Sequence, residues 1–106
     1  MEELNQAIQL DPGCADCYYN RGVIYERRED FESARREFAR ALALEPLHVD
    51  ALYHRAAAHR KLGDYAGAIA DLEACLSATE DLPDVDRAHL EGLIQEIEAE
   101  AGPRAR

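Results

Sequence analysis

Two cysteines form the one motif in this sequence whose spacing suits chemistry. Cys14 and Cys17 are separated by two residues. At the start of a helix, where the thiol pKa can fall, such a pair can cycle between dithiol and disulfide. Redox pairs of this kind normally follow a β-strand, whereas the residues around this pair predict helices. Thiol chemistry or metal binding at Cys14 and Cys17 is therefore one interpretation of this motif, and the alternative is that the two cysteines have no chemical role.

The simpler interpretation assigns Cys14 and Cys17 no chemistry. We expect Cys17 to take the place of a small residue, as Ala51 does later in the chain, and Cys14 to be an incidental loop residue. A zinc site needs two ligands beyond this pair. His48 is expected at the wrong end of another helix pair, and Cys75 falls at a core position.

No other group of residues has the spacing of a catalytic or metal site. The histidines are not spaced as a ligand set; they are His48, His54, His59 and His89. The acidic residues near Asp81 and Asp86 lack the glycine turn and bidentate glutamate of a calcium loop. There is also no phosphate-cradling glycine loop or nucleophile elbow. We therefore predict no enzyme activity, no cofactor and no bound metal.

Composition limits the class of protein. A chain of 106 residues has the length of one domain. Its 22 acidic and 12 basic residues give a formal charge of −10, which argues against nucleic-acid binding. No apolar run approaches the roughly 18–20 residues of a membrane span, so no membrane contact is predicted. Three cysteines, an odd number, do not build a disulfide scaffold, which predicts a reducing, cytoplasmic location.

The chain repeats itself with a period of 34 residues. Shifting the sequence by this interval pairs identical residues, among them Asp16 with Asp50, Tyr19 with Tyr53, Arg21 with Arg55, Asp30 with Asp64 and Ala34 with Ala68. Within each unit the apolar residues recur at helical spacing. The pattern predicts six helices, at about 2–10, 15–28, 31–44, 49–62, 65–78 and 84–101.

Caps and small residues complete the pattern. Asp30 and Asp64 are expected to be N-caps. Gly22 and Ala34 are expected where two antiparallel helices cross, because only a small side chain lets the backbones approach. Ala56 takes the place of Gly22 in the second unit.

This spacing resembles the tetratricopeptide repeat. The resemblance rests on Tyr18, Arg21, Gly22 and Tyr25, followed by Ala34, Phe38, Ala41 and Pro46, and on a weaker second copy in which His59 replaces the aromatic residue at Tyr25. It implies an all-α, right-handed superhelix of antiparallel helix pairs. The expected organisation is one domain over 1–106, of about 2.5 repeats and a C-terminal capping helix: a half repeat at 1–14, repeats at 15–48 and 49–82, a capping helix at 83–101 and a tail at 102–106.

The resemblance also implies a protein-interaction module that binds a peptide or helix of a partner in its concave groove. The first helix of each pair lines that side. The expected groove residues are Asp16, Tyr19, Asn20, Val23 and Arg27, with Asp50, Tyr53, His54, Ala57 and Lys61 at the equivalent positions. One alternative is that Tyr19 and Tyr53 pack between repeats and touch no ligand. A structural fragment of a longer array, with no groove ligand, is another.

The open N-terminal end bears on oligomeric state. The first helix resembles the second half of a repeat whose first half is missing, and short arrays bury little apolar surface. The expected state is a monomer or a weak homodimer through this end. The identity of the protein partner is not predicted.

Overall fold

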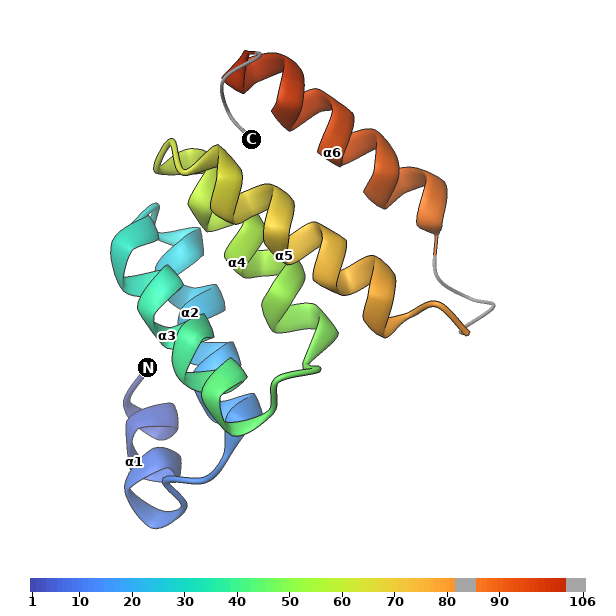
Figure 1. Cartoon of the computed structure of the whole chain (residues 1–106). Helices are drawn as coiled ribbons and strands as arrows, with labels where there is room; N and C mark the ends of the chain where they lie inside the picture. Colours follow the sequence, from blue (N-terminus) through green and yellow to red (C-terminus); the bar gives the residue numbers. More distant parts are fainter. Residues whose placement is uncertain (82–85, 103–106) are drawn as a thin grey trace.

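The chain folds into six α-helices and, among the described residues 1–81 and 86–102, no strand. The structure is a computed structural model, shown in Figure 1. The helices are α1 (Glu2–Leu10), α2 (Ala15–Arg27), α3 (Phe31–Leu44), α4 (Val49–Lys61), α5 (Tyr65–Ala78) and α6 (Arg87–Ala101). The six predicted helices are confirmed. The last helix begins at Arg87, after its N-cap Asp86, so it starts later than the prediction that residue 86 is already helical. The expected helical residues 84–85 and the tail from 103 lie outside the described residues.

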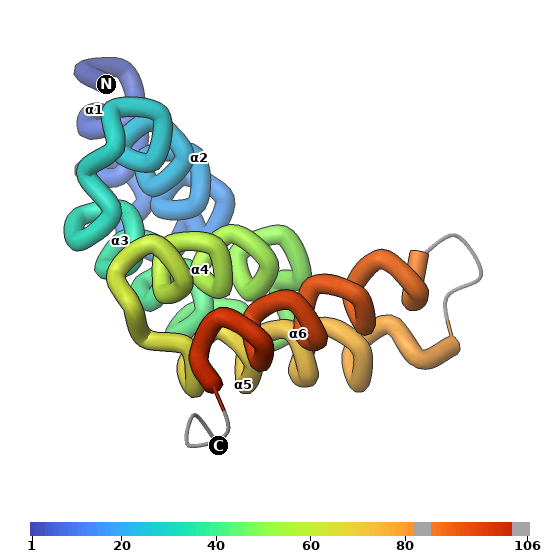
Figure 2. The backbone as a smooth tube through the Cα atoms, turned by 90° about the horizontal axis from the view of Figure 1, so that it is seen from above, coloured from blue at the N-terminus to red at the C-terminus, as the bar shows by residue number. Residues whose placement is uncertain are grey.

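Consecutive helices pack against one another along the array. The pairs α2–α3 and α4–α5 form the two repeats, α3 packs on α4, and α5 packs on α6. Seen from above, the array bends, and α2, α4 and α6 lie on the inner side of the bend while α1, α3 and α5 lie on the outer side (Figure 2). This arrangement confirms the predicted all-α solenoid.

Side chains at the helix starts satisfy backbone N–H groups that have no partner inside the helix. The carboxylate of Asp30 accepts from Ser33 N–H at 3.2 Å, and that of Asp64 accepts from Gly67 N–H at 3.0 Å. Both predicted N-caps are therefore confirmed. The residue before each of these caps, Glu29 and Gly63, has a positive φ, of 60° and 83°. The turn thus has the same backbone shape in both repeats.

The crossing of α2 and α3 depends on Gly22, as its sequence position predicts. A Cβ atom added to Gly22 would lie 2.6 Å from Cε1 and 2.8 Å from Cδ1 of Phe38. Phe38 and Ala34 are fully buried. In the second repeat Ala56 and Leu72 hold the same positions and are also buried. The larger ring of the first repeat is thus matched to the smaller residue beside it.

A buried ion pair recurs at the same point of each repeat. Arg55 binds Asp71 through two hydrogen bonds of 2.8 Å, and the carboxylate of Asp71 is nearly buried. Arg21 pairs with the nearly buried Glu37 at the equivalent position through a single hydrogen bond from its Nε. Burying a charge costs free energy unless an opposite charge pairs with it. Each arginine of the first helix therefore allows an acidic residue to be buried on the face of the second helix that packs against the first.

The last helix covers the end of the array, as predicted. Its apolar residues Leu90, Ile94 and Ile97 are buried in the same core cluster as residues of α4 and α5. The first helix is different, because none of its residues is buried and Leu10 is 88% exposed. No helix in 1–81 or 86–102 is long and apolar enough to cross a membrane.

Candidate functional site

The ten predicted groove residues all lie on α2 and α4, the two complete first helices of the array. Asp16 and Asp50 are in the first turns of these helices, and Arg27 and Lys61 are in the last turns. The groove face therefore carries acidic side chains along one edge and basic side chains along the other. The bend of the array places α6 beside α4 on the same inner side (Figure 2).

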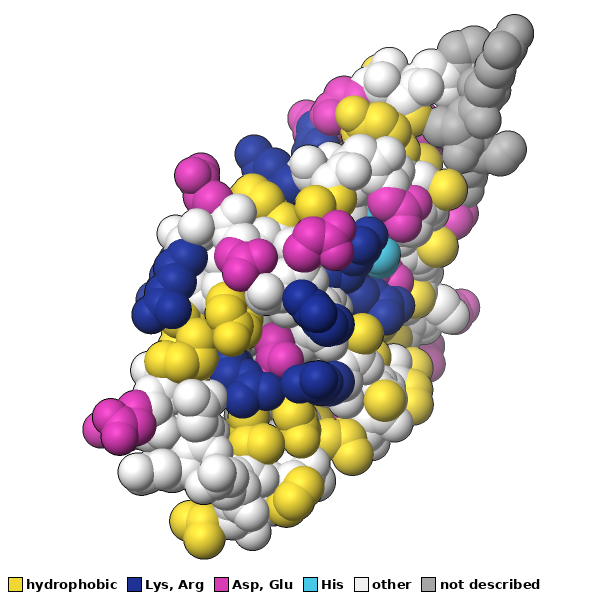
Figure 3. Space-filling view, turned by 90° about the vertical axis from the view of Figure 1, so that its left-hand side faces the viewer, with side chains coloured by type: hydrophobic (Ala, Val, Ile, Leu, Met, Phe, Trp, Pro, Cys, Tyr) yellow, Lys and Arg dark blue, Asp and Glu magenta, His cyan; other side chains and the backbone are white. Residues whose placement is uncertain are grey.

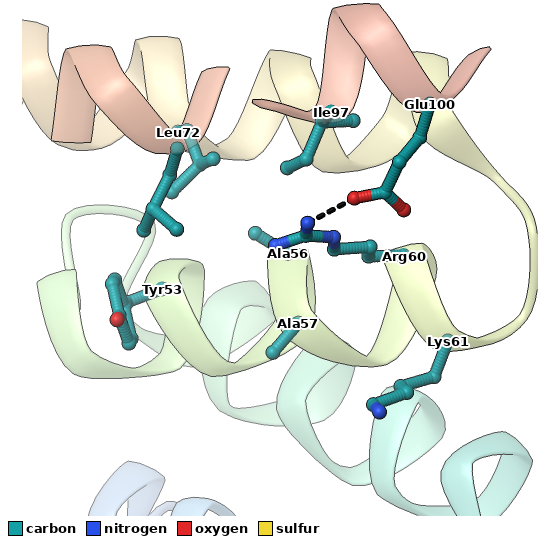
Figure 4. Close-up of a pocket in the computed structure, with 9 residues that line it drawn as sticks. Tyr53, Ala56, Ala57, Arg60, Lys61, Leu72, Ile97 and Glu100 are labelled. Atoms are coloured by element: carbon teal, nitrogen blue, oxygen red, sulfur yellow. Dashed lines mark hydrogen bonds and ion pairs between the residues drawn. The ribbon is translucent and has the colours of Figure 1, made fainter. Parts of the chain in front are cut away.

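A pocket of about 480 Å³ opens between α4 and α6, with Leu72 of α5 at its base. Three predicted groove residues line it, namely Tyr53, Ala57 and Lys61. The remaining lining residues are Ala56, Arg60, Leu72, Leu93, Ile97 and Glu100. Figure 4 shows Leu72 and Ile97 facing this space, with Tyr53 toward one end and an Arg60–Glu100 ion pair toward the other. The pocket is thus apolar inside and polar at both ends.

The two ends of the pocket are held by contacts between α4 and α6. The Arg60 guanidinium hydrogen-bonds Glu100 and holds the pKa of that carboxyl below its usual range. At the other end the Tyr53 hydroxyl lies 3.3 Å from His89 Nε2. Lys61 is exposed and projects from the rim, away from the Arg60–Glu100 pair (Figure 4). An acidic group on a ligand can reach Lys61 without breaking that pair.

Tyr19 is packed between the repeats. Its ring lies 5.9 Å from Phe38, 5.0 Å from His48 and 5.5 Å from His54, measured between centroids. Burial, with the nearby Asp50 and Glu26 carboxylates, raises its pKa. The side chain keeps part of its surface accessible. The contacts between repeats expected under the alternative interpretation are therefore present at Tyr19.

Two further predicted groove residues form polar contacts within the protein. His54 Nδ1 lies 3.0 Å from Glu26 Oε1, and Asp16 Oδ1 lies 2.8 Å from His48 Nε2. Asn20 and Arg27 are exposed on α2, and Val23 is half-buried between them. The exposed polar groups of this face thus include Asn20 and Arg27 on α2 and Asp50 and Lys61 on α4.

The high net charge is not spread evenly over the molecule. On the face in Figure 3, basic side chains gather in a central band and acidic side chains lie around them. The formal charge of −10 therefore does not make this face uniformly acidic.

The cysteine motif differs from the sequence prediction. Cys14 is the N-cap of α2, and it forms a disulfide with Cys17. The interpretation of Cys14 as an incidental loop residue is wrong, whereas the cysteine pair at a helix start that the alternative interpretation describes is present, in its disulfide form. The reason is local geometry, because the first turn of a helix brings residues three apart close together, here with Cα atoms 5.3 Å apart. Cys75 is buried as predicted, and burial raises its pKa to about 11.

His48 also lies closer to this motif than its sequence position suggested, through its contact with Asp16. Ligand atoms of Asp16, Glu45 and His48 are within 4.8 Å of one another, which is a spacing that could hold a metal ion. His48 Nδ1, however, accepts the Ala51 N–H at 3.1 Å, so the proton is on Nε2 and points to Asp16. Because no ring nitrogen keeps a free lone pair, this cluster serves as a helix cap and not as a metal site.

His59 occupies the position of Tyr25, as predicted, and is mostly buried. Its ring nitrogens face Asp64 at 3.2 Å and Asp71 at 3.5 Å, and Nδ1 makes no aligned hydrogen bond. Burial lowers the pKa of His59, although the two carboxylates oppose this shift. The His59 imidazole is therefore a mostly buried polar group that packs between α4 and α5.

Comparison with known proteins agrees with the repeat geometry. The family profile described as tetratricopeptide repeat matches residues 25–83. The chain belongs to the tetratricopeptide repeat family. Mouse serine/threonine-protein phosphatase 5 is 38% identical over 69 residues, and the human protein is 36% identical over the same length. The match covers 65% of this chain and 14% of each phosphatase.

Solved tetratricopeptide repeat structures have the same fold. The TPR2B domain of yeast Sti1, in its complex with pHsp70, superposes with a TM-score of 0.83 at 21% identity, covering 93% of this chain and 80% of that one. PcrH, in complex with the chaperone binding region of PopD, gives 0.84 at 17% identity over 93% and 76%. The Yersinia enterocolitica translocator chaperone SycD gives 0.85 at 12% over 92% and 68%.

The sequence prediction of the groove missed the contribution of the last helix. The sequence pattern predicts a capping helix at 83–101 but places none of its residues in the groove, and it does not include Arg60, although Leu93, Ile97, Glu100 and Arg60 all line the pocket. The signal that could have revealed this contribution is the row of apolar residues along α6. Not all of them are needed to cover the core, so some are left to line a pocket. The repeat register does not reveal it, since α6 departs from the 34-residue pattern.

Proposed function

We propose that this chain is a protein-interaction module that binds a segment of a partner protein along the inner face of α2, α4 and α6. The observation that carries the proposal is the pocket between α4 and α6. Leu72, Leu93 and Ile97 make its interior apolar, which suits an aliphatic or aromatic side chain of the ligand. The exposed groups of α2 then extend the surface along the bend.

The charges suggest how a ligand would lie. Lys61 and Arg27 are at the C-terminal ends of their helices, so the basic edge of the groove favours acidic groups there. Asp16 and Asp50 make the opposite edge unfavourable for an anion. A segment with an apolar anchor followed by an acidic residue on the Lys61 side fits this arrangement. The complexes named for Sti1 and PcrH support the general mode, in which a fold of this kind holds part of another protein.

The remaining expectations belong to the same proposal. The chain acts as one unit over 1–106, with repeats at 15–48 and 49–82 between the half repeat at 1–14 and the capping helix at 83–101. It works in the cytoplasm, without catalysis or cofactor, as a monomer or a weak homodimer. The ten predicted groove residues form the contact face together with the pocket residues of α6.

A pair of matched variants tests the groove. A segment captured with this chain as bait is made as a synthetic peptide and titrated by calorimetry. Ala57→Arg fills the exposed centre of the groove, whereas Ala70→Arg places the same side chain on the exposed outer side of α5. We expect Ala57→Arg to weaken binding by about tenfold or more and Ala70→Arg to leave the affinity unchanged.

The opposite result has a clear meaning. Equal affinity of the two variants, with both folded by circular dichroism, would show that the peptide binds elsewhere. Asn20→Ala and Arg27→Ala, at exposed positions of α2, extend the test. Weaker binding in these variants would show that the ligand crosses both repeats.

A further inference from the structure

The Cys14–Cys17 disulfide has no role in the proposed groove, and its position is unusual for a structural bond. It lies at the first turn of α2, and the Cys14 sulfur also accepts the Cys17 N–H at 3.1 Å. Both cysteines are only half-buried. A disulfide that closes so short a loop restricts the unfolded chain less than one that closes a long loop. Its contribution to folding is therefore a weak reason for its presence.

The next repeat shows that the fold does not need this bond. His48 and Ala51 stand at the positions of Cys14 and Cys17, 34 residues later. There the His48 Nδ1 accepts the Ala51 N–H at 3.1 Å and caps α4 in the same way. A side chain with one acceptor atom is thus sufficient at this turn. The helix cap therefore does not explain why two cysteines stand at this turn, and the disulfide is a feature additional to the cap.

The pair is also open to a reactant. A pocket of about 370 Å³ lies beside Cys14, at the junction of the α1–α2 and α3–α4 turns. Its lining residues are Gly13, Cys14, Ala15, Asp16, Leu44 and Glu45. Cys75 gives the contrast within the same chain, because it is fully buried and its sulfur faces the Val49 carbonyl oxygen at 3.7 Å. A small thiol can thus approach Cys14 but has no path to Cys75.

We propose that Cys14 and Cys17 form a reversible redox site that exchanges with small thiols of the glutathione class. The thiolate of one glutathione attacks the Cys14 sulfur through the pocket and forms a mixed disulfide. The Cys14–Cys17 bond breaks, and its electron pair leaves on the Cys17 sulfur, in the first turn of α2 where the helix dipole stabilises an anion.

A second glutathione completes the exchange. Its thiolate attacks the glutathione sulfur of the mixed disulfide, so that oxidised glutathione leaves and Cys14 becomes a thiolate. The two cysteines take up the two protons that the glutathione thiols lost. Two electrons have then passed from two thiols to the protein disulfide, and the reverse sequence oxidises the protein again. This inference does not depend on groove binding.

Charged groups around the pair affect which thiol reacts well. The carboxylates of Asp16 and Glu45 line the same pocket, and Asp16 is held by His48. These negative charges disfavour the approach of an anionic thiol. The test therefore includes 2-mercaptoethanol, which is uncharged apart from its thiol, beside glutathione.

The experiment measures the redox state of the native chain in buffers with a series of reduced-to-oxidised glutathione ratios. Samples are quenched with acid, unfolded, labelled with N-ethylmaleimide and weighed by mass spectrometry. We expect a reversible step in which the chain passes from label on Cys75 alone to label on all three cysteines. With 2-mercaptoethanol the same step is expected at a faster rate.

Variants separate redox exchange from structure. Cys14→His combined with Cys17→Ala copies the cap of α4, so we expect unchanged helix content and no redox step. Cys75→Ala should leave the midpoint of the step unchanged. Brief labelling of the reduced native chain should modify Cys14 at least about tenfold faster than Cys75.

Three results would overturn the proposal. The first is label on all three cysteines at every ratio, because no disulfide then forms. The second is a disulfide that yields to glutathione and 2-mercaptoethanol only after the chain is unfolded, because the bond is then structural. The third is loss of the step in Cys75→Ala, because the exchange then involves another pair.

Discussion

Replacing Gly22 with alanine tests the central packing argument of this fold. In an exposed helix interior this change stabilises by roughly 1 kcal/mol, because alanine has the higher helix propensity. At Gly22 the new methyl group would lie 2.6 Å from Cε1 and 2.8 Å from Cδ1 of Phe38. The Phe38 ring is fully buried, so it has no open space to move into. Overpacking of this kind costs roughly 1–3 kcal/mol.

The crowding is expected to exceed the gain in helix propensity. We therefore predict that Gly22→Ala lowers the free energy of unfolding by up to about 2 kcal/mol, measured by urea unfolding monitored by circular dichroism. At this chain length the melting temperature should fall by roughly 4–8 °C per kcal/mol. Gly92→Ala is the matched control, because nothing lies within 4 Å of a Cβ at Gly92 in α6. It should be neutral or stabilising.

The second repeat supplies a rescue for the same test. Ala56 and Leu72 stand where the first repeat has Gly22 and Phe38. The double variant Gly22→Ala with Phe38→Leu should therefore lose less stability than the two single variants added together, by about 0.5–3 kcal/mol. A Gly22→Ala chain as stable as the parent, or a double variant that shows simple additivity, would refute the close-approach reasoning.

Three further predictions concern the turn, the ion pair and the buried histidine. Glu29 has a φ of 60° where the next repeat has a glycine, so Glu29→Gly should stabilise the chain by about 1 kcal/mol in urea unfolding; a loss of stability would contradict the strain argument. Arg55→Ala leaves the carboxylate of Asp71 buried without its bidentate partner and should destabilise by about 2–3 kcal/mol, whereas adding Asp71→Ala should recover part of the loss. Burial lowers the pKa of His59 in the folded chain, so as the pH falls the unfolded chain protonates this imidazole before the folded chain does. The free energy of unfolding should therefore fall as the pH drops below about 6.5, measured by urea unfolding at a series of pH values. His59→Gln should remove this part of the pH dependence.

The helices and the family were predictable from local and periodic signals. Asp30 and Asp64 cap their helices where the sequence predicts, since an N-cap depends only on residues three positions apart. Gly22 was assigned to the helix crossing because its smallness recurs as Ala56 one period later. The turns and the crossing therefore follow from single residues in a repeating register.

The candidate site was predictable only in part. The positions of the ten predicted residues on α2 and α4 follow from helical spacing, and three of them line the α4–α6 pocket. The contributions of Leu93, Ile97 and Glu100 were missed, because α6 does not obey the repeat. Its placement over α4 depends on how its apolar face meets the core. Whether the ten residues contact a ligand stays a prediction.

The sequence by itself determined the number of helices, the repeat register and the small residues at the crossings, because these depend on interactions between neighbours in the chain. It also placed most helix ends to within one residue, although α6 begins at Arg87 and not at 84. The tertiary structure alone decided which charged residues of different helices meet. It paired Arg55 with Asp71 and Arg60 with Glu100. It brought His48, at the start of α4, to Asp16, at the start of α2. It also opened a pocket between α4 and α6. Such contacts join segments far apart in the sequence, and their distances arise only when the helices pack.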